Sequence, residues 1–487
     1  MDNKFINKFL KGSAFSSIGT LVTILVHFLS VKVLASIPRV DFGTYTYIIV
    51  ISHGFQILSG LGLNLTLVKH LSDDLDKLER PVVTGIFLAR LLQLGFISII
   101  VYAAGHLFLP VLTNDSVVPY IVFIPVIFAL ASVRDLLFHL LQGIQKFNQY
   151  AYINIFSAVV RLGSILFFAY IGQLTIPNLI WVEILTYGIS LIVLLIYAPL
   201  SKIFTWQVDG AAFKKIFGFG LPLYANDILT YVYNRINVLL IGGMLTPVSV
   251  ALYDMAGKIP DGFNRLFSSL IVVYFPSISE LLNNDKREEA RKFMNRGLVL
   301  GSAALSLAAL GVFLFRDEVI LIVAHEQYLE ASLALALLMI NFNLNSIARM
   351  MGYSIVAAGF TKVPVKINLV SSVANVVGCL LLIPRFGYVG AIYSLLGMNV
   401  ISQALNYFFL IRADLKPEFI GFAKSTVFLL VLIAGYTVLG IDSYWVRVVV
   451  LLLYMGLCWF SIPEIKPSVR YGMNYLGLGK WLPSGSV

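Results

Sequence analysis

Long apolar stretches separated by short polar connections run along almost the whole chain. A transmembrane helix needs roughly 20 consecutive apolar residues, and the sequence offers fourteen such stretches from residue 12 onward. The pattern predicts an all-α polytopic membrane protein. The expected spans are 12–35, 42–66, 82–109, 117–141, 150–172, 177–199, 214–243, 248–281, 293–314, 331–357, 362–383, 387–411, 419–440 and 443–461.

Three stretches depart from a simple span. The eighth is too long for one crossing and contains Pro260 and Pro276, so we expect a kink or an amphipathic extension beyond the membrane. Residues 318–330 are too short to cross, and we expect an interfacial half-helix there on the outer side. The first stretch is too long for the apolar core of a signal peptide, which predicts an uncleaved span.

Basic residues fall on alternate connections between the spans. Of the 35 Lys and Arg, only Arg39, Arg316 and Arg385 lie on the loops of the opposite set. Short loops rich in Lys and Arg stay cytoplasmic, so we expect a multi-pass protein of the cytoplasmic (inner) membrane with both termini in the cytoplasm. The net charge of +10 is then explained by loops that face anionic lipids, and we expect no nucleic acid partner.

A faint internal repeat relates the two halves of the chain. At an offset of 208 residues, Tyr45 falls on Tyr253 and Phe55 on Phe263. Parallel repeats of this kind hold a substrate site between them near the midplane of the bilayer. We therefore expect an N-terminal six-helix lobe over 1–200, a C-terminal six-helix lobe over 201–415, two extra transmembrane helices over 416–465 and a cytoplasmic tail over 466–487.

Seven basic side chains lie well inside predicted spans, where a central Arg or Lys facing lipid costs roughly 2.5–3.5 kcal/mol. We therefore expect them to face a water-filled interior or each other. Two groups recur at the spacing of one helix face, one in the eighth span and one in the tenth. The candidates for contact with an anionic substrate are Arg161, Arg235, Lys258, Arg265, Arg349, Asn341 and Asn345, and the supporting or coupling candidates are Asp227, Asp254, Asp261, Glu183 and His27.

These residues also have structural interpretations. The stripe from Asp254 to Arg265 is compatible with internal ion pairs that make a buried helix tolerable. His27 is compatible with a packed, hydrogen-bonded role, and Arg90 with a side chain that extends to the inner headgroups. Three arginines have no acidic residue one turn away, which favours anion binding, because a guanidinium binds phosphate through two hydrogen bonds. They are Arg161, Arg235 and Arg349.

The sequence lacks the motifs that would indicate catalysis. There is no G-x-x-x-x-G-K-[ST] phosphate loop, no G-x-S-x-G elbow, no H-E-x-x-H and no Cys/His cluster. Cys379 and Cys458 lie within apolar spans, so we expect neither a disulfide nor a Cys-based metal site. We expect transport without chemistry: no enzyme activity, no cofactor and no metal.

A series of short motifs runs from about residue 5 to residue 411. They include Asp41-Phe42-Gly43-Thr44-Tyr45, Gly60-Leu61-Gly62-Leu63-Asn64, Gly218-Phe219-Gly220-Leu221-Pro222, Leu252-Tyr253-Asp254 and Ile383-Pro384-Arg385-Phe386-Gly387. In this order and spacing they resemble the multidrug/oligosaccharidyl-lipid/polysaccharide (MOP) exporter superfamily, in its polysaccharide-transporter branch of Wzx-like flippases for O-antigen or capsule repeat units.

The resemblance implies two six-helix lobes around a central V-shaped cavity, with two additional C-terminal helices. It implies a flippase that moves an isoprenoid-pyrophosphate-linked oligosaccharide repeat unit from the inner to the outer leaflet by alternating access. The product would serve O-antigen, capsule or exopolysaccharide synthesis. The implied partners are this lipid-linked oligosaccharide, membrane lipids, a polysaccharide polymerase and glycosyltransferases.

Two departures from the superfamily's patterns bear on the substrate. The family often has Asp where this chain has Asn237, and lipid II flippases carry arginines in the first two spans, where this chain has His27 and His53. A surface polysaccharide is therefore favoured over a peptidoglycan precursor. The alternative is a proton- or sodium-coupled multidrug or cation antiporter of the same fold, in which Glu183 or Asp227 carries the coupling ion.

Overall fold

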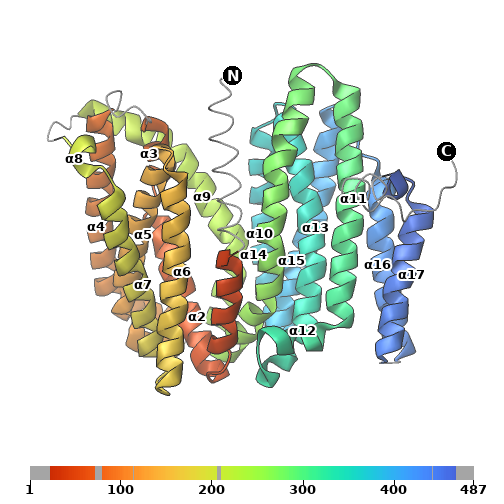
Figure 1. Ribbon diagram of the computed structural model, residues 1–487, viewed down its shortest axis with the longest axis horizontal. Coiled ribbons are helices and arrows are strands. Elements are labelled where there is room, and N and C mark those ends of the chain that lie inside the picture. The colour runs from red at the N-terminus through yellow and green to blue at the C-terminus, as the bar shows by residue number, and fades with distance from the viewer. Residues whose placement is uncertain (1–21, 72–78, 113–114, 206–209, 441–442, 468–487) are drawn as a thin grey trace. The chain divides into compact units, whose positions relative to one another are not determined.

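The computed structural model describes residues 22–71, 79–112, 115–205, 210–440 and 443–467 (Figure 1). Within these ranges the chain is helical and contains no strand. Eleven helices are long and apolar enough to cross a membrane, or twelve when the bent pair α2 (Arg39–Leu58) and α3 (Leu63–His70) counts as one span. The prediction of an all-α, multi-pass membrane protein is confirmed.

The long helices after α3 begin and end within about six residues of the predicted limits. They are α4 (Arg80–Leu112), α5 (Phe123–Gly143), α6 (Phe147–Tyr170), α7 (Ile176–Tyr197), α9 (Gly210–Met244), α10 (Pro247–Asn283), α11 (Arg287–Leu314), α13 (Ser332–Ala357), α14 (Lys362–Phe386), α15 (Tyr388–Arg412), α16 (Phe419–Leu439) and α17 (Tyr444–Ser461). Short elements lie between some of them: η2 (Asp115–Tyr120), α8 (Leu200–Ile203), α12 (Arg316–Val323) and η3 (Glu326–Ala331). Residues 318–330, predicted as too short to cross, thus lie in the short helices α12 and η3 and in the two residues between them.

Two of the fourteen predicted spans are not among the candidate membrane helices. The first, 12–35, lies partly outside the described residues, and its described part is the helix Val22–Leu34. The seventh, 214–243, lies in α9, where Asn234, Arg235 and Asn237 interrupt the apolar sequence. The count of fourteen therefore stays a prediction. Most of the predicted tail 466–487 also lies outside the described residues.

The chain divides into two compact units. Unit 1 comprises residues 1–255, 321–328 and 379–391, and unit 2 comprises residues 256–320, 329–378 and 392–487. Within unit 1, α5 packs against α2, α3 and α7, and α9 packs against α2 and α4. Within unit 2, α11 packs against α13, α16 and α17, and the last two helices lie side by side (Figure 1). The lobe boundaries drawn from the sequence, and the cavity between the lobes, stay predictions.

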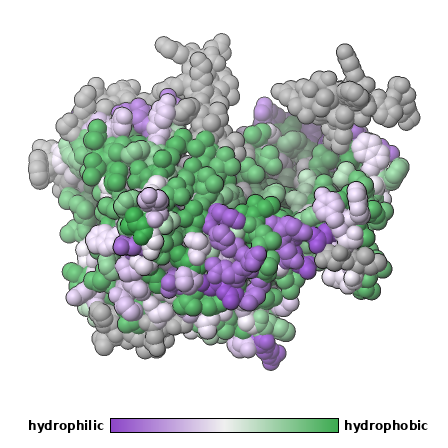
Figure 2. Space-filling model, turned by 60° about the horizontal axis from the view of Figure 1, so that its bottom comes forward, coloured by the Kyte–Doolittle hydropathy of each residue, from purple (hydrophilic) through white to green (hydrophobic). Residues whose placement is uncertain are grey.

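Large apolar side chains are exposed on the surface of the helices. Leu92 in α4, Ile196 in α7, Val438 in α16 and Phe460 in α17 each expose more than two thirds of their area. Figure 2 shows hydrophobic side chains over much of the visible surface. Soluble monomeric proteins rarely expose apolar patches of this extent, so this surface is suited to contact with lipid.

The predicted span 42–66 is broken into two helices, and glycine fixes the break. Helices α2 and α3 are bent by 52° relative to one another. Gly62, directly before α3, has a φ of +65°, in the left-handed region that glycine adopts without strain. A Cβ atom on Gly62 would lie 2.1 Å from the carbonyl oxygen of Gly220 in α9. The backbone of α9 therefore packs directly against this break and leaves no room for a side chain at position 62.

Candidate functional site

Side chains from three helices of unit 1 meet around Arg161. The Arg161 Nε of α6 donates to Oε1 of Glu183 on α7 at 2.7 Å, and Nη2 donates to the hydroxyl of Tyr45 on α2 at 3.0 Å. The Tyr45 hydroxyl donates to the same Glu183 oxygen. The side chain of Glu183 is 5% exposed and that of Arg161 is 21% exposed. We call these three residues the Arg161 cluster.

The hairpin of α6 and α7 brings the two charges to a similar depth. Arg161 lies nine residues before the end of α6 at Tyr170, and Glu183 lies seven residues after the start of α7 at Ile176, so they are roughly 14 Å and 10 Å along their helices from the connection. Removing one partner of a buried ion pair leaves an uncompensated charge and costs about 3–5 kcal/mol. The ion pair with Glu183 neutralises Arg161 in the structure. Its predicted contact with substrate stays a prediction.

A second network of polar side chains in unit 1 forms hydrogen bonds at the C-terminus of α2, where the span is broken. The Arg90 side chain of α4 is only 2% exposed, which differs from an extension toward the headgroups. Its guanidinium donates to the carbonyl oxygen of Ser59, the residue that caps α2, and to Oδ1 of Asn64 at 2.9 Å. The Nδ2 of Asn64 donates to Asp135 of α5. A cation is favourable at a helix C-terminus, where carbonyl groups lack partners.

A cavity of about 40 Å³ lies beside this network. Its lining includes Arg90, Asn64, Asp135 and Asp227, a half-buried residue of α9. A cavity of this size with polar walls has room for a water molecule and too little for a sugar. The structure thus places the coupling candidate Asp227 beside a small polar cavity within unit 1.

The other candidates of unit 1 differ in exposure. Arg235 of α9 is exposed, and no hydrogen bond or ion pair joins it to another described residue. Asp254 of α10 is buried at 9% exposure, and His27 is half-buried on the helix Val22–Leu34. Asn237, which stands where the family often has Asp, is buried and donates to the carbonyl oxygen of Ala391 at 3.0 Å.

In unit 2, Arg349 of α13 is held by neutral groups of α10. Its guanidinium donates to Oδ1 of Asn264 and to the hydroxyl of Ser268. The guanidinium carbon lies 5.4 Å from the ring centroid of Phe267, a cation–π arrangement. No ion pair joins Arg349 to a carboxylate among the described residues. The half-buried Arg349 is therefore solvated by protein groups without being neutralised.

The remaining candidates of unit 2 lie on α13 and α10. Asn341 accepts a hydrogen bond from Nδ2 of Asn399 on α15 at 2.7 Å, and Asn345 is half-buried one turn further along α13. On α10, Lys258 is half-buried, while Asp261 and Arg265 are exposed. Each lies at the helical position that the sequence pattern predicted, because α10 is one unbroken helix from Pro247 to Asn283.

Several polar partners were absent from the predicted site. Tyr45 and Asn264 give no signal in the sequence, because each is a single polar residue with no charge. Asn399 could have been found, since Asn399, Gln403 and Asn406 follow a helical spacing in the twelfth predicted span. Gln403 donates to the carbonyl oxygen of Leu344 on α13 at 2.8 Å.

Groups that could bind metal are not concentrated anywhere in the described part of the chain. No three His, Cys, Asp or Glu side chains lie close enough there to hold an ion. Cys379 and Cys458 are both free and buried. The arrangements above are those of hydrogen bonding and charge pairing.

Three comparisons with known proteins bear on identity. The chain is 24% identical over 278 residues to the probable low-salt glycan biosynthesis flippase Agl15 of Haloferax volcanii, a match that covers 56% of this chain and 57% of that protein. Its fold is similar to that of the lipid II flippase MurJ in an inward closed conformation, with a TM-score of 0.68 and 13% identity over 91% of this chain and 98% of that one. It is equally similar, with a TM-score of 0.68 and 12% identity, to an inward-facing multidrug resistance MATE family transporter of the MOP superfamily, over 80% of this chain and 94% of that one.

At these identities the two solved structures establish the fold alone. The family is established by sequence, because residues 37–333 match the family described as polysaccharide biosynthesis protein. These residues make up more than half of the 487 in the chain, and the predicted resemblance is confirmed. The chain therefore belongs to the polysaccharide biosynthesis protein family, and it has the fold of the MOP superfamily.

Proposed function

We propose that this protein is a flippase for a lipid-linked oligosaccharide. It moves an isoprenoid-pyrophosphate-linked repeat unit from the inner to the outer leaflet of the cytoplasmic membrane, for the synthesis of a surface polysaccharide such as O-antigen, capsule or exopolysaccharide. Both termini lie in the cytoplasm, as the distribution of Lys and Arg indicates. A polysaccharide polymerase and glycosyltransferases are its partners in this proposal.

The family match over residues 37–333 carries the proposal. The relative Agl15, a probable low-salt glycan biosynthesis flippase, supports the same substrate class. The chain spans little more than half of that relative, so the activity as a whole belongs to the proposal. Transport without covalent chemistry agrees with the sequence, which lacks phosphate-loop and nucleophile motifs.

Cationic side chains with neutral partners or with none support a pyrophosphate site. Arg349 is held by an amide oxygen, a hydroxyl and an aromatic ring, so its positive charge is left for an anion. Arg235 is exposed, and no hydrogen bond or ion pair joins it to another described residue. A guanidinium matches the geometry of phosphate oxygens. The proposed contact residues are Arg161, Arg235, Lys258, Arg265, Arg349, Asn341 and Asn345.

Alternating access is the proposed mechanism, with the lipid tail remaining in the bilayer while the headgroup crosses. Asp254 and Asp261 would hold Lys258 and Arg265 in place when no substrate is bound, because they follow at helical spacing on α10. Arg161 would become available to an anion only if its bond to Glu183 opened. This assigns Glu183 a role in switching the charge of Arg161.

Flipping is tested in proteoliposomes that contain the purified protein and an isoprenoid-pyrophosphate-linked oligosaccharide. The sugar that appears on the outer leaflet is measured with an externally added glycosidase. We expect transport by the natural chain, a loss of at least tenfold in Arg349→Gln, and no loss in Lys292→Gln. Lys292 is a matched control because it is an exposed cation on α11. Equal transport in both variants would contradict the anion site.

The antiporter alternative rests on the fold shared with a multidrug resistance transporter. In that case Glu183 or Asp227 carries the coupling proton or sodium ion, and Glu183→Gln or Asp227→Asn abolishes efflux of a cationic dye such as ethidium. Dye efflux without sugar translocation in the same vesicles would replace the flippase proposal with this one.

A further inference from the structure

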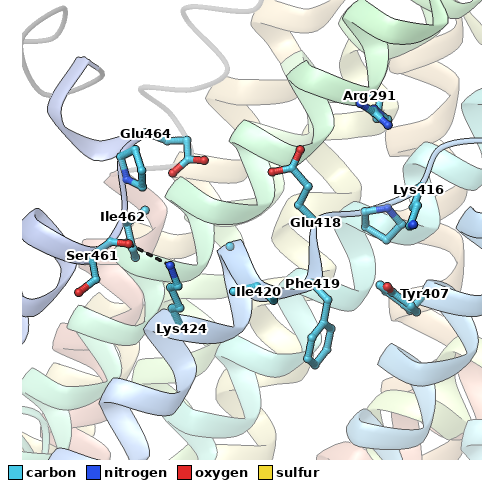
Figure 3. A pocket seen from close by; sticks show the side chains of 13 residues that line it. Arg291, Tyr407, Lys416, Glu418, Phe419, Ile420, Lys424, Ser461, Ile462 and Glu464 are labelled. Atoms are coloured by element: carbon cyan, nitrogen blue, oxygen red, sulfur yellow. Dashed lines mark hydrogen bonds between the residues drawn. The ribbon is translucent and has the colours of Figure 1, made fainter.

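A pocket of unit 2 lies where the ends of four helices meet. It forms at the start of α11, the end of α15, the start of α16 and the end of α17, and its volume is about 610 Å³. Three cations and two carboxylates line it together with apolar side chains (Figure 3). The charged residues are Arg291, Lys416, Lys424, Glu418 and Glu464. None of them belongs to the proposed transport site.

The location of the pocket suits contact with lipid headgroups. The helices that form it are membrane-span candidates, and the pocket occupies their ends. By the distribution of basic residues these ends face the cytoplasm, where anionic lipids concentrate. Basic pockets between helices at this level suit phosphate-bearing headgroups.

The bonds of the three cations leave positive charge available in the pocket. Lys416 is exposed, and no hydrogen bond or ion pair joins it to another described residue. Arg291 pairs with Glu288 on its own helix at 3.1 Å, outside the pocket. Lys424 donates to the carbonyl oxygen of Ser461 at 3.2 Å, which ties α16 to α17 and leaves its other protons available.

The charges in the pocket indicate a ligand that has hydrogen-bond donors in addition to a phosphate. In Figure 3, Arg291 and Lys416 lie on one side of Glu418, and Lys424 and Glu464 lie on the other. Carboxylates accept hydrogen bonds, so a headgroup that carries N–H or O–H donors next to its phosphate satisfies both kinds of side chain. A choline headgroup does not fit in this way, because its nitrogen carries three methyl groups and no N–H to donate.

Apolar side chains continue from the pocket onto the lipid-facing surface. Phe419 is 55% exposed and Ile420 is 71% exposed, and both line the pocket. The ring of Phe419 is held by Tyr407, with centroids 5.7 Å apart in an edge-to-face arrangement. A polar pocket that opens onto an exposed apolar surface fits a ligand with a charged head and an acyl tail.

We infer that this pocket binds a glycerophospholipid through its phosphodiester headgroup, and that the headgroup carries hydrogen-bond donors, as phosphatidylglycerol and phosphatidylethanolamine do. The phosphate lies against Lys416 and Arg291, and the donors face Glu418 and Glu464. The site is separate from substrate transport and does not depend on the proposed function.

Native mass spectrometry of the full chain in a neutral detergent tests the inference. Dioleoyl phosphatidylglycerol, phosphatidylethanolamine and phosphatidylcholine are added in turn, and the bound lipids are counted. We expect one tightly bound molecule of each of the first two and weaker binding of the third. Lys416→Gln should weaken phosphatidylglycerol binding about fivefold, as about 1 kcal/mol per charge near a membrane surface predicts. Adding Arg291→Gln should weaken it about fivefold again.

Lys292→Gln is the matched control, because Lys292 follows Arg291 in α11, is 74% exposed and does not line the pocket. We expect its binding to equal that of the natural chain. Equal binding of all three lipids, or equal weakening by Lys292→Gln, would show diffuse attraction and overturn the site. Undecaprenyl phosphate provides a further arm. Displacement of phosphatidylglycerol by an equimolar amount of it would assign the pocket to the carrier lipid and overturn the glycerophospholipid assignment.

Discussion

Two arginines, one in each unit, are held in different ways. Arg161 of unit 1 bonds to the carboxylate of Glu183, which cancels its charge. Arg349 of unit 2 bonds to Asn264 and Ser268, whose oxygens stabilise the charge and leave it in place. Neither arginine has an acidic residue one turn away in the sequence, yet only Arg161 is neutralised in the structure. The difference separates a cation that secures a helix hairpin from one suited to meet an anion.

The largest effect is expected from removing the carboxylate in unit 1. Glu183→Gln leaves Arg161 buried without a counter-charge, so the free energy of unfolding should fall by about 3–5 kcal/mol. Thermal unfolding of the purified protein in detergent measures the change. The double variant Arg161→Met with Glu183→Leu should recover most of the loss, because it removes both charges. No recovery would show that the pair is not the main stabilising contact of this hairpin.

A smaller loss is expected at the break between α2 and α3. Arg90→Met leaves the Ser59 carbonyl and Asn64 without their donors, which costs about 2–3 kcal/mol. Arg80→Met is the control, since Arg80 is exposed at the start of the same helix, and its effect should stay within about 0.5 kcal/mol. The same unfolding measurement compares them, and equal losses would mean that the bonds to Ser59 and Asn64 contribute nothing.

Arg349→Met should lower stability by only about 1 kcal/mol. Its partners Asn264 and Ser268 are only half-buried, so water can replace the lost hydrogen bonds, whereas Arg90 is almost fully buried. Transport should nevertheless be lost. Proteoliposome flipping and thermal unfolding, measured on the same preparation, distinguish the two effects. A loss of stability as large as that of Glu183→Gln would show that Arg349 mainly stabilises the fold, and would contradict its role in binding an anion.

The smallest effect concerns an exposed pair of unit 1. Lys215 donates to Glu79 at 3.1 Å, and this bond holds the pKa of Glu79 below its usual value. A depressed pKa stabilises the fold above the pKa of the unfolded carboxyl, and the stabilisation is lost as the pH falls through the folded value. Because both side chains are about half exposed, the change between about pH 5 and pH 3 should not exceed about 0.5 kcal/mol. Lys215→Gln should reduce this dependence and leave the part due to His70, whose Nδ1 lies 3.2 Å from the same carboxylate oxygen. Lys214→Gln, at its exposed neighbour, should keep the whole dependence.

The spans were predictable because lipid imposes a long apolar run on every crossing. The break in the second span was not, since Leu61 and Leu63 continue the apolar run while the backbone turns at Gly62. Gly60 and Gly62 permit a turn at this point, but the backbone that packs against the turn is that of Gly220, more than 150 residues away along the chain. The neighbouring residues alone therefore do not show that the helix breaks.

The helices that carry the candidate residues were predictable, and the partners of these residues were not. Helical spacing placed Asn341, Asn345 and Arg349 on one helix, as the structure has them. The partner of Arg161 is not an acid one turn away on the same helix, because Glu183 lies on the next helix. The sequence nevertheless contains a signal for this pair, since Arg161 and Glu183 are equally far along the chain from Gly172 in the connection.

The burial of both cysteines makes the natural chain a ready background for mapping its topology. Cys379 is 0% exposed and Cys458 is 4% exposed, so a maleimide reagent should leave the folded protein almost unlabelled. A single thiol introduced at a connection would then report by itself which aqueous compartment that connection faces. Labelling of intact cells with a membrane-impermeant maleimide would thus assign inside and outside loop by loop.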